Sequence, residues 1–454
     1  MVEEKNLPEN QYSGFHPSSQ CVPLPRVSPS ISPREFFERF VATRQPCIIT
    51  AHLQDPEWKG HLWSDLFLAE HAGDQNVQVE RKGTDGNFGK GNRRLEMPFR
   101  TFLRSSDQSL YMTTQYSDQP SRLEDFCHPP LNCLLDSFPS RPALMGNLVP
   151  KQVNLWMGSS NGSSSGLHFD YHDNLYVLLR GQKTFKLFSP KDVDHLYVNG
   201  KVHNVHSNGL ITFAPDIRSD GASKDEVIKW KISKLEALIE VLREDGQDIK
   251  KEEIQLENLF DAVLSGSLQN PGFAAGDDTC SEEDVALSED WNVIDDFDEM
   301  NKNDDFSDDV ESSEESGLKP EPPSFSQISP SQLRDFTMRS KVSDSFPLLA
   351  KATSITVNLS FGEMLYMPAS WFHEVQSDHK GEESSHMAMN YWFYPPSIVP
   401  GHKAEFSAPY EDSFWEENWA ETDKALKIVL NPRNQKGKRA READLVKMAC
   451  KRAC

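Results

Sequence analysis

Alternating hydrophobic and polar positions predict a β-rich core. Residues 175–180 carry apolar side chains on both faces of an extended run, which is typical of a strand in a buried sheet. Gly181 predicts a short hairpin turn, and residues 183–188 predict a return strand that a Ser-Pro pair ends. A second apolar and aromatic run, at 364–367, leads into a bend that contains proline.

Helical spacing of apolar residues occurs outside these strands. Ser64 precedes an apolar run and has the position of a helix N-cap, whereas residues 45–50 form a short apolar run typical of a buried strand. The predicted helices cover 33–41, 63–68, 232–243, 414–419 and 422–430.

The formal net charge of −23 is concentrated in one tract. Residues 277–315 hold 18 Asp and Glu residues against one Lys, so the rest of the chain carries a charge of only about −6. The tract has neither helical nor strand periodicity, which predicts disorder. Three interpretations stay open: a solvated insertion, a binding tract for basic partners, and phosphorylation at Ser281, Ser288 or Ser307.

Composition limits the location and the partners. There is no apolar run of about 18 residues and the N-terminus is polar, so neither a membrane span nor a secretory signal is expected. The seven scattered cysteines are typical of reduced intracellular thiols. A basic cluster at 436–441 indicates either nuclear localisation or a solvated tail, so cytoplasm and nucleus both stay open. The basic residues are too few for an extended nucleic-acid surface.

Two motifs far apart in the chain carry the candidate chemistry. His168 and Asp170 lie two positions apart in an extended run, so their side chains point to the same side. His373 follows the apolar run at 364–367 and its proline bend. Two histidines and one carboxylate on one face form the facial triad of non-haem Fe(II) oxygenases. The sequence therefore predicts an iron site.

Lys183 begins the predicted return strand and can point into the same cavity. A lone buried ammonium needs an anionic partner, which a dicarboxylate cosubstrate would supply. The ordinary alternative is a solvated lysine on an edge strand.

These motifs together resemble those of a known family. They are His-x-Asp, an Asn six residues after the first His, Gly-x-Lys ending fifteen residues after it, and Gly-Glu-x-Leu-Tyr-x-Pro-x-x-Trp-x-His. In this order they are similar to the JmjC, or cupin-like, 2-oxoglutarate oxygenases. The nearest likeness is to the small hydroxylase branch, which includes the asparaginyl hydroxylase of hypoxia-inducible factor.

The resemblance implies a mainly β fold with flanking helices, built on a double-stranded β-helix (jelly-roll, cupin-like) core. It implies Fe(II) as cofactor, with 2-oxoglutarate and O₂ as cosubstrates. It assigns His168, Asp170 and His373 as catalytic iron ligands and Lys183 as the partner of the distal carboxylate. Further residues fall where the family has pocket side chains: Asn174, Tyr111, Ser165, Asn390 and Trp392. Each of these also has an ordinary interpretation, as a turn or strand-end amide, a loop hydroxyl or a core aromatic.

The expected domain spans 31–400 and is interrupted by an insertion at about 216–340, which contains the acidic tract at 277–316. Residues 1–30 form an N-terminal extension. Residues 401–454 form a helical C-terminal extension with a basic tail, and its helices are a candidate homodimer contact by analogy with related hydroxylases.

The resemblance favours hydroxylation of a protein side chain, with 2-oxoglutarate converted to succinate and CO₂. Histone-lysine demethylation is the second interpretation, since the acidic tract could hold basic histone tails. Hydroxylation of a tRNA base and a non-catalytic JmjC scaffold are two further alternatives. The substrate, its target residue and the oligomeric state are not fixed by the sequence.

Overall fold

The computed structural model describes residues 10–18, 23–83, 87–88, 94–116, 122–267, 322–339, 341–379, 385–397 and 404–430. The chain divides into two compact units, one made of 1–213 with 316–454 and the other of 214–315. The acidic tract at 277–316 and the basic cluster at 436–441 lie outside the described residues, so what we expect of them stays a prediction.

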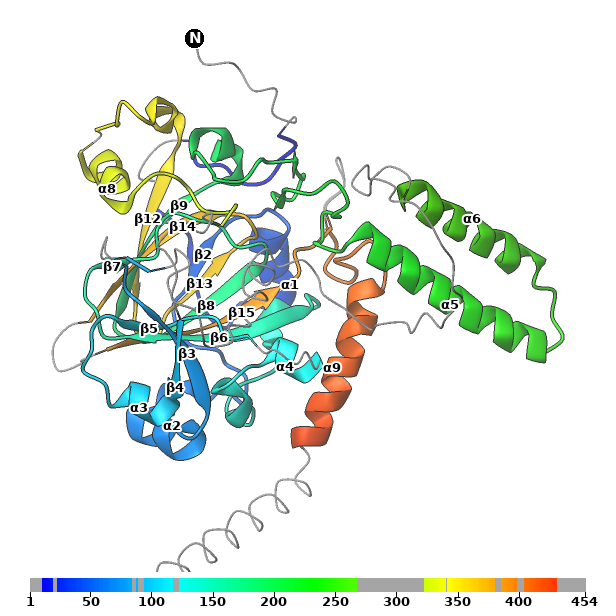
Figure 1. Cartoon of the computed structure of the whole chain (residues 1–454), viewed down its shortest axis with the longest axis horizontal. Helices are drawn as coiled ribbons and strands as arrows, with labels where there is room; N and C mark the ends of the chain where they lie inside the picture. Colours follow the sequence, from blue (N-terminus) through cyan, green and yellow to red (C-terminus); the bar gives the residue numbers. More distant parts are fainter. Residues whose placement is uncertain are drawn as a thin grey trace, which may run out of the picture. The chain divides into compact units, whose positions relative to one another are not determined.

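The first unit contains two large sheets. Across the described residues, the larger sheet has the strand order β1-β2-β13-β8-β15-β6-β5-β3-β4 and the smaller one β12-β9-β14-β7 (Figure 1). The larger sheet consists of β1 (Arg26–Val27), β2 (Cys47–Ile49), β13 (Met364–Met367), β8 (Asp173–Arg180), β15 (His386–Phe393), β6 (Pro150–Gly158), β5 (Leu110–Met112), β3 (Asn76–Arg81) and β4 (Arg94–Pro98). The smaller sheet consists of β12 (Ser354–Ser360), β9 (Gln182–Phe188), β14 (Phe372–Asp378) and β7 (Ser163–Ser164). A separate antiparallel pair is made of β10 (Asn204–Val205) and β11 (Ile211–Thr212).

The eight core strands are shared between the two sheets, and the chain changes sheet between consecutive core strands except from β9 to β12, which pair with each other. The strands β6, β8, β13 and β15 lie in the larger sheet, and β7, β9, β12 and β14 in the smaller one. All ladders among these strands are antiparallel. This is the topology of a jelly roll, so the predicted double-stranded β-helix is confirmed.

The hairpin predicted around Gly181 is wrong, although both strands form. β8 pairs with β13 and β15, whereas β9 pairs with β12 and β14 in the other sheet. Gly181 has φ of 78°, and a Cβ there would lie 2.7 Å from the Asp378 carbonyl oxygen. The chain thus crosses between sheets at a position where only glycine fits. The sequence pattern could not show this change of sheet. Both strands would be buried whether they paired with each other or lay in different sheets, so their apolar pattern is the same in the two cases.

The space between the sheets is filled by side chains from both of them. Leu178 and Leu365 from the larger sheet pack with Phe185, Leu187 and Ile355 from the smaller one. Each Å² of apolar surface buried between the sheets contributes about 25 cal/mol to stability, so this packing holds the two sheets together. The site described below lies in this layered core.

Helices lie at the ends and edges of the first unit (Figure 1). The predicted helix at 33–41 is confirmed as an α-turn followed by a π-turn, and Ser64 caps its helix by accepting a hydrogen bond from the Phe67 amide. The two predicted C-terminal helices form one continuous helix. The α-helices of this unit are α1 (Pro33–Phe36), α2 (Asp65–Ala72), α3 (Phe99–Leu103), α4 (Arg122–Phe126), α8 (Pro330–Arg339) and α9 (Phe414–Leu430). Short turns of other helix types cover Phe37–Val41, Gly60–Leu62, Leu131–Cys133, Ala143–Met145, Pro190–His195 and Pro347–Lys351.

The end of the expected insertion packs within the first unit. Residues 322–339 fall inside the predicted insertion, yet Ile328, Leu333 and Phe336 are buried in one cluster with Leu167 and Phe169. This returning segment therefore lies beside the predicted iron ligands.

The second unit is a helical pair. Its helices are α5 (Lys224–Glu244), which contains the predicted helix at 232–243, and α6 (Lys250–Ser267). Val227, Leu235 and Ile239 are the buried apolar residues of α5. None of the helices in the described part of the chain is both long enough and apolar enough to cross a bilayer.

Candidate metal centre and its pocket

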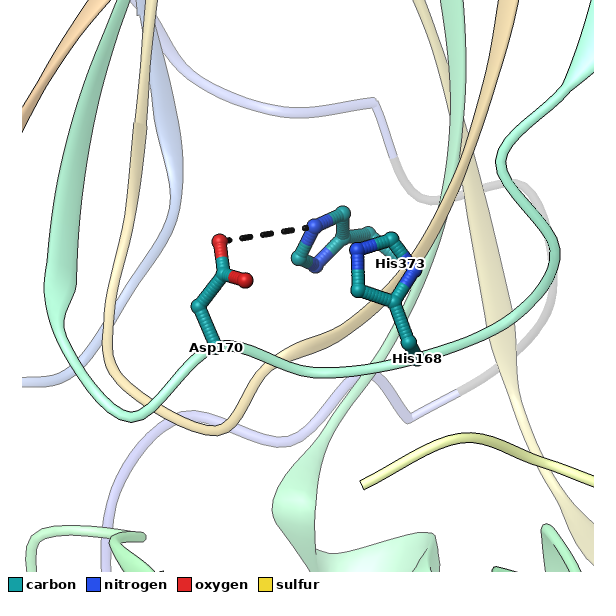
Figure 2. Close-up of side chains that lie close together, drawn as sticks. All are labelled: His168, Asp170 and His373. Carbon is teal, nitrogen blue, oxygen red and sulfur yellow. Dashed lines mark ion pairs between the residues drawn. The ribbon is translucent and has the colours of Figure 1, made fainter. Parts of the chain in front are cut away.

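The structure brings His168, Asp170 and His373 together. One donor atom from each lies within 4.8 Å of the donor atoms of the other two. His373 Nε2 is 3.7 Å from Asp170 Oδ2, and Figure 2 shows all three side chains directed toward one space. Two imidazoles and one carboxylate on one side of that space are the donor set of the facial iron triad. The donor set therefore fits Fe(II).

Backbone contacts hold the two histidines against each other. The His168 amide donates to the His373 carbonyl over 3.1 Å, and the His373 amide donates back over 2.7 Å. Each ring is then oriented by a carbonyl two residues earlier: His168 Nδ1 lies 3.1 Å from Gly166 O and His373 Nδ1 lies 3.0 Å from Trp371 O. A carbonyl only accepts, so Nδ1 carries the proton and Nε2 presents its lone pair to a metal.

The environment keeps His168 neutral. Burial, followed by the neighbouring His373, lowers the pKa of His168 to about 4, although Asp170 acts in the opposite direction. Phe325 stacks on the imidazole with ring centroids 4.7 Å apart and planes 13° apart. At neutral pH the ring is therefore deprotonated at Nε2, as a metal ligand must be.

A chain of hydrogen bonds leads from Trp156 to Asp170. The Trp156 indole donates to Asn390 Oδ1 over 2.8 Å, and Asn390 Nδ2 donates to Asn174 Oδ1 over 3.1 Å. Asn174 Nδ2 then points to Asp170 Oδ2 at a longer 3.4 Å. An indole can only donate and a carboxylate can only accept, so both amide orientations are fixed by the ends of the chain.

Ser165 belongs to a segment that is more ordered than its sequence indicates. The stretch of serines and glycines around 159–166 predicts a flexible loop, yet β7 pairs with β14. Ser165 Oγ donates to Gly166 O and accepts from the Val375 amide, each over 3.0 Å. The hydroxyl thus fixes the backbone before His168 and also lines the pocket.

Lys183 is buried, with only 1% of its surface exposed. Its ammonium donates to Ser377 Oγ over 2.5 Å and lies 3.4 Å from His386 Nδ1. Burial lowers the pKa of Lys183 to about 7, and the charge of Asp378 opposes this shift. A bound carboxylate would raise that pKa again by stabilising the charged form.

A cavity joins the triad to Ser377, the hydrogen-bond partner of Lys183; Lys183 itself is not among the residues that line the cavity in the described part of the chain. The cavity encloses about 590 Å³ of empty space, part of it open to solvent, and Ser377 lines it. Tyr111 also lines it, and the Lys183 ammonium lies 5.6 Å from the centre of the Tyr111 ring. Burial raises the pKa of Tyr111, so its phenol stays protonated and can donate a hydrogen bond. The other predicted residues lining the cavity are His168, Asp170, His373, Asn174, Asn390 and Ser165.

Trp392 occupies a different place from the one expected. It is not among the residues that line this cavity in the described part of the chain. Its ring stacks on His172, with centroids 5.7 Å apart and planes 21° apart. The aromatic side chains that do line the cavity are Phe88, Tyr111, Trp156, Tyr176 and Phe185.

A buried ion pair supports the same region. Both carboxylate oxygens of Asp173 accept from the Arg44 guanidinium, over 2.8 and 2.5 Å, and both side chains are fully buried. Asp173 also accepts from the Tyr366 hydroxyl over 2.7 Å and from the Ala369 amide over 2.8 Å. Asp173 therefore ties the segment after Asp170 to the bend that precedes His373.

Sequence reasoning missed four residues of the site. Ser377 and His386 could have been found by strand period, since 373, 375 and 377 share one face of β14 and 386, 388 and 390 share one face of β15. The indole of Trp156 had no such signal, because its partner Asn390 is distant in sequence. Phe325 reaches His168 only after the chain returns from the insertion.

The eight-strand core shared between two sheets and the three converging donors define the class as a double-stranded β-helix protein with a candidate facial metal triad. A family model described as "Cupin-like domain" matches residues 33–398. The chain is 33% identical to JmjC domain-containing protein 4 of Schizosaccharomyces pombe, over 95% of this chain and 97% of that protein. The chain therefore belongs to the JmjC, or cupin-like, family.

Two other relatives are more distant. JmjC domain-containing protein E of Dictyostelium discoideum is 21% identical over 79% of this chain and 80% of its own length. The bifunctional peptidase and (3S)-lysyl hydroxylase JMJD7 of Homo sapiens is 29% identical over 38% of this chain and 57% of its own length. The resemblance to the JmjC family is thus confirmed, whereas the comparisons do not test the finer placement in the hydroxylase branch.

Proposed function

We propose that the chain is an Fe(II)- and 2-oxoglutarate-dependent oxygenase that hydroxylates a side chain of a protein substrate. The observation that carries this proposal is the arrangement of two features around one cavity. Three metal donors lie at its wall, and Lys183 lies behind Ser377, which lines the same cavity. A 2-oxo dicarboxylate has matching ends, one that chelates a metal and one that pairs with an ammonium.

The iron, when bound with 2-oxoglutarate and O₂, supplies the oxidation that converts 2-oxoglutarate to succinate and CO₂ and inserts the second oxygen atom into a substrate C–H bond. The residues of this chain provide the positions. His168, Asp170 and His373 leave one side of the metal site open to the cavity. Lys183 and Tyr111 present donors to the distal carboxylate, and the apolar walls exclude water from the reacting atoms.

The substrate class follows from a relative and not from the pocket. The name of the partial match in Homo sapiens states lysyl hydroxylase activity. We extend this to the present chain as a proposal that the hydroxylated side chain is a lysine of a folded or extended protein partner.

The test is an anaerobic titration of the full chain with Fe(II) and then 2-oxoglutarate. Chelation of the metal by the 2-oxo acid gives a weak visible charge-transfer band. We expect the band in the wild type, its loss in Asp170→Ala, and a much higher 2-oxoglutarate requirement in Lys183→Ala. A folded wild type that shows no band and binds neither ligand would overturn the oxygenase proposal.

The substrate is tested separately, with the Mn(II)-loaded chain as an inert trap. Proteins retained in the presence of 2-oxoglutarate are incubated with the Fe(II) enzyme and examined by mass spectrometry. We expect one added oxygen on a lysine of a retained protein, and no addition with Asp170→Ala. Loss of a methyl group from a retained histone would instead identify a demethylase.

A further inference from the structure

His386 is a buried histidine at the start of β15 that no part of the metal site explains. It has no exposed surface. Its Nδ1 lies 3.4 Å from the Lys183 ammonium, and its Nε2 lies 3.1 Å from the Ser160 carbonyl oxygen. The imidazole therefore lies between a group that can only donate and a group that can only accept.

These two contacts determine the protonation of the ring. Nε2 must carry a proton, because the Ser160 carbonyl accepts. Nδ1 must carry a lone pair, because the Lys183 ammonium donates. Burial and then the charge of Lys183 lower the pKa of His386 to about 2, which keeps this single neutral tautomer at any physiological pH.

We propose that His386 is the positioning residue of the distal-carboxylate site, and that its neutral imidazole holds the Lys183 ammonium without cancelling its charge. This inference rests on the oxygenase function proposed above. Among the described residues, Ser377 and His386 are the two hydrogen-bond partners of the ammonium, which has three N–H donors, so one donor would serve a bound carboxylate. A carboxylate at 386 would pair with Lys183 and compete with the cosubstrate, whereas an apolar residue would leave the ammonium free to rotate.

The surrounding backbone leaves room for this ring. Gly158 is the register partner of His386 on β6, and a Cβ at 158 would lie 3.1 Å from His386 Cε1 and 2.6 Å from Tyr111 Cδ2. A Cβ at Gly181 would lie 2.9 Å from His386 Cβ. Two glycines on neighbouring segments thus accommodate the imidazole beside Lys183 and Tyr111.

The prediction is specific for one end of the ligand. A 2-oxo acid without the distal carboxylate, such as 2-oxobutyrate, uses the metal but not Lys183. If His386 acts through Lys183, its replacement changes the affinity for 2-oxoglutarate and leaves the affinities for 2-oxobutyrate and for the metal unchanged. A residue that only fills the core would change all three together.

The experiment is calorimetric titration of the Mn(II)-loaded full chain with 2-oxoglutarate and with 2-oxobutyrate. We expect His386→Leu to raise the Kd for 2-oxoglutarate by about tenfold to a hundredfold, the value of one charge-assisted hydrogen bond. His386→Asn keeps an oxygen acceptor close to the position of Nδ1, so it should stay within about threefold of the wild type. The Kd for 2-oxobutyrate should be the same in all of them.

His386→Asp provides a matched comparison with His386→Asn, since the two side chains differ in charge and hardly in size. We expect the Asp variant to bind 2-oxoglutarate at least about tenfold more weakly than the Asn variant, because its carboxylate pairs with Lys183. This pair keeps the inference testable if the Leu variant does not fold.

Three outcomes overturn the inference. They are an unchanged 2-oxoglutarate Kd in His386→Leu, equal Kd values in the Asn and Asp variants, and parallel losses of metal, 2-oxobutyrate and 2-oxoglutarate binding. A wild type that binds Mn(II) but neither 2-oxo acid would instead overturn the proposed oxygenase function, so the two failures are distinguishable.

Discussion

His168 and His373 form a hydrogen-bonded antiparallel pair, in which each backbone amide donates to the carbonyl of the other. The two histidines are distant in sequence, and these backbone hydrogen bonds fix their relative position. The Nδ1 contacts to Gly166 O and Trp371 O orient both rings as well. Contacts that do not involve a metal thus hold both ligand rings in position, and such support lowers the entropic cost of metal binding.

Metal binding should stabilise the wild-type fold and depend on Asp170. With free metal at about 100 times its Kd, the gain is about 2.7 kcal/mol, which a thermal unfolding scan detects as a higher Tm. Asp170→Ala should lose this rise and bind metal more than about 100-fold more weakly, because only two donors remain. Addition of a chelator should return the wild type to the Tm of the metal-free chain.

A histidine outside the site provides the control. His203 is exposed, and His203→Ala should keep the full metal-dependent rise in Tm. Equal rises in the wild type and Asp170→Ala would show that the ion binds elsewhere.

The affinity for 2-oxoglutarate should fall as the pH rises above about 7. Burial lowers the pKa of Lys183 to about 7, so the ammonium is charged below this pH and neutral above it. The distal carboxylate requires the charged form, and the two neighbours of the ammonium keep their charge in this range, because burial lowers the pKa of His386 and raises that of Tyr111. The Kd should therefore be constant below about pH 7 and rise by about tenfold per pH unit above it.

Titrations of the Mn(II)-loaded chain over about two pH units on either side of 7 measure this dependence. The matched control is 2-oxobutyrate, whose Kd should not follow the protonation of Lys183. A 2-oxoglutarate Kd that stays constant through pH 8 would show that Lys183 remains charged in the empty site or does not contact the ligand.

The parts of the site that the sequence predicts are those set by local spacing. His168 and Asp170 are two residues apart, so their common direction follows from strand period. The expected position of Lys183 depended on a hairpin between β8 and β9 that does not form, although Lys183 does lie near the opening of β9. The sheet change at Gly181 could not be predicted, because it depends on the approach of Asp378 and His386 from distant strands.

Contacts made by the segment that follows the insertion could not be predicted from the sequence either. The stacking of Phe325 on His168 requires the segment after the insertion to pack beside the ligands, and composition alone assigned that segment to the insertion. Trp392 shares a face of β15 with Asn390, as strand period predicts, but it lies against His172 and outside the cavity lining. The two-residue period of a strand predicts to which face a side chain points, but it does not predict whether that side chain reaches the cavity.

The indole of Trp156 should orient Asp170 through the two asparagines. Trp156→Phe removes the N–H that fixes the Asn390 amide and keeps most of the apolar contact. Without it both amides can rotate, and Asn174 then no longer has to present its N–H to Asp170. We expect metal affinity to fall by about tenfold, the lower end for an outer hydrogen-bond partner, with thermal stability of the metal-free chain changed by less than about 1 kcal/mol.

Two observations together test this role. Metal titration gives the affinity, and unfolding of the metal-free chain shows whether the core has been disturbed. Equal metal affinity in the wild type and Trp156→Phe would show that the hydrogen-bond chain does not act on Asp170. A large loss of stability would show that Trp156 serves mainly in packing.

The buried Arg44–Asp173 pair should be a major determinant of stability. Both side chains are fully buried, and Asp173→Asn would leave the guanidinium without a compensating charge. Such a loss costs about 3–5 kcal/mol, which denaturant unfolding of the metal-free chain measures. The surface pair Arg81–Asp107 is the matched control: its atoms are 3.1 Å apart, but 53% and 40% of the two side chains are exposed.

Asp107→Asn should cost about 1 kcal/mol or less, because solvent already screens that pair. Asp173→Asn should in addition weaken metal binding under conditions where it is still folded, since Asp173 connects β8 to the Ala369 amide ahead of His373. If Asp173→Asn lowered the free energy of unfolding by no more than Asp107→Asn does, the buried Arg44–Asp173 pair would not be a major stabilising contact. An unchanged metal affinity in folded Asp173→Asn would show that the bend before His373 is held by other contacts, such as the hydrogen bond from the Ser370 amide to the Asp170 carbonyl.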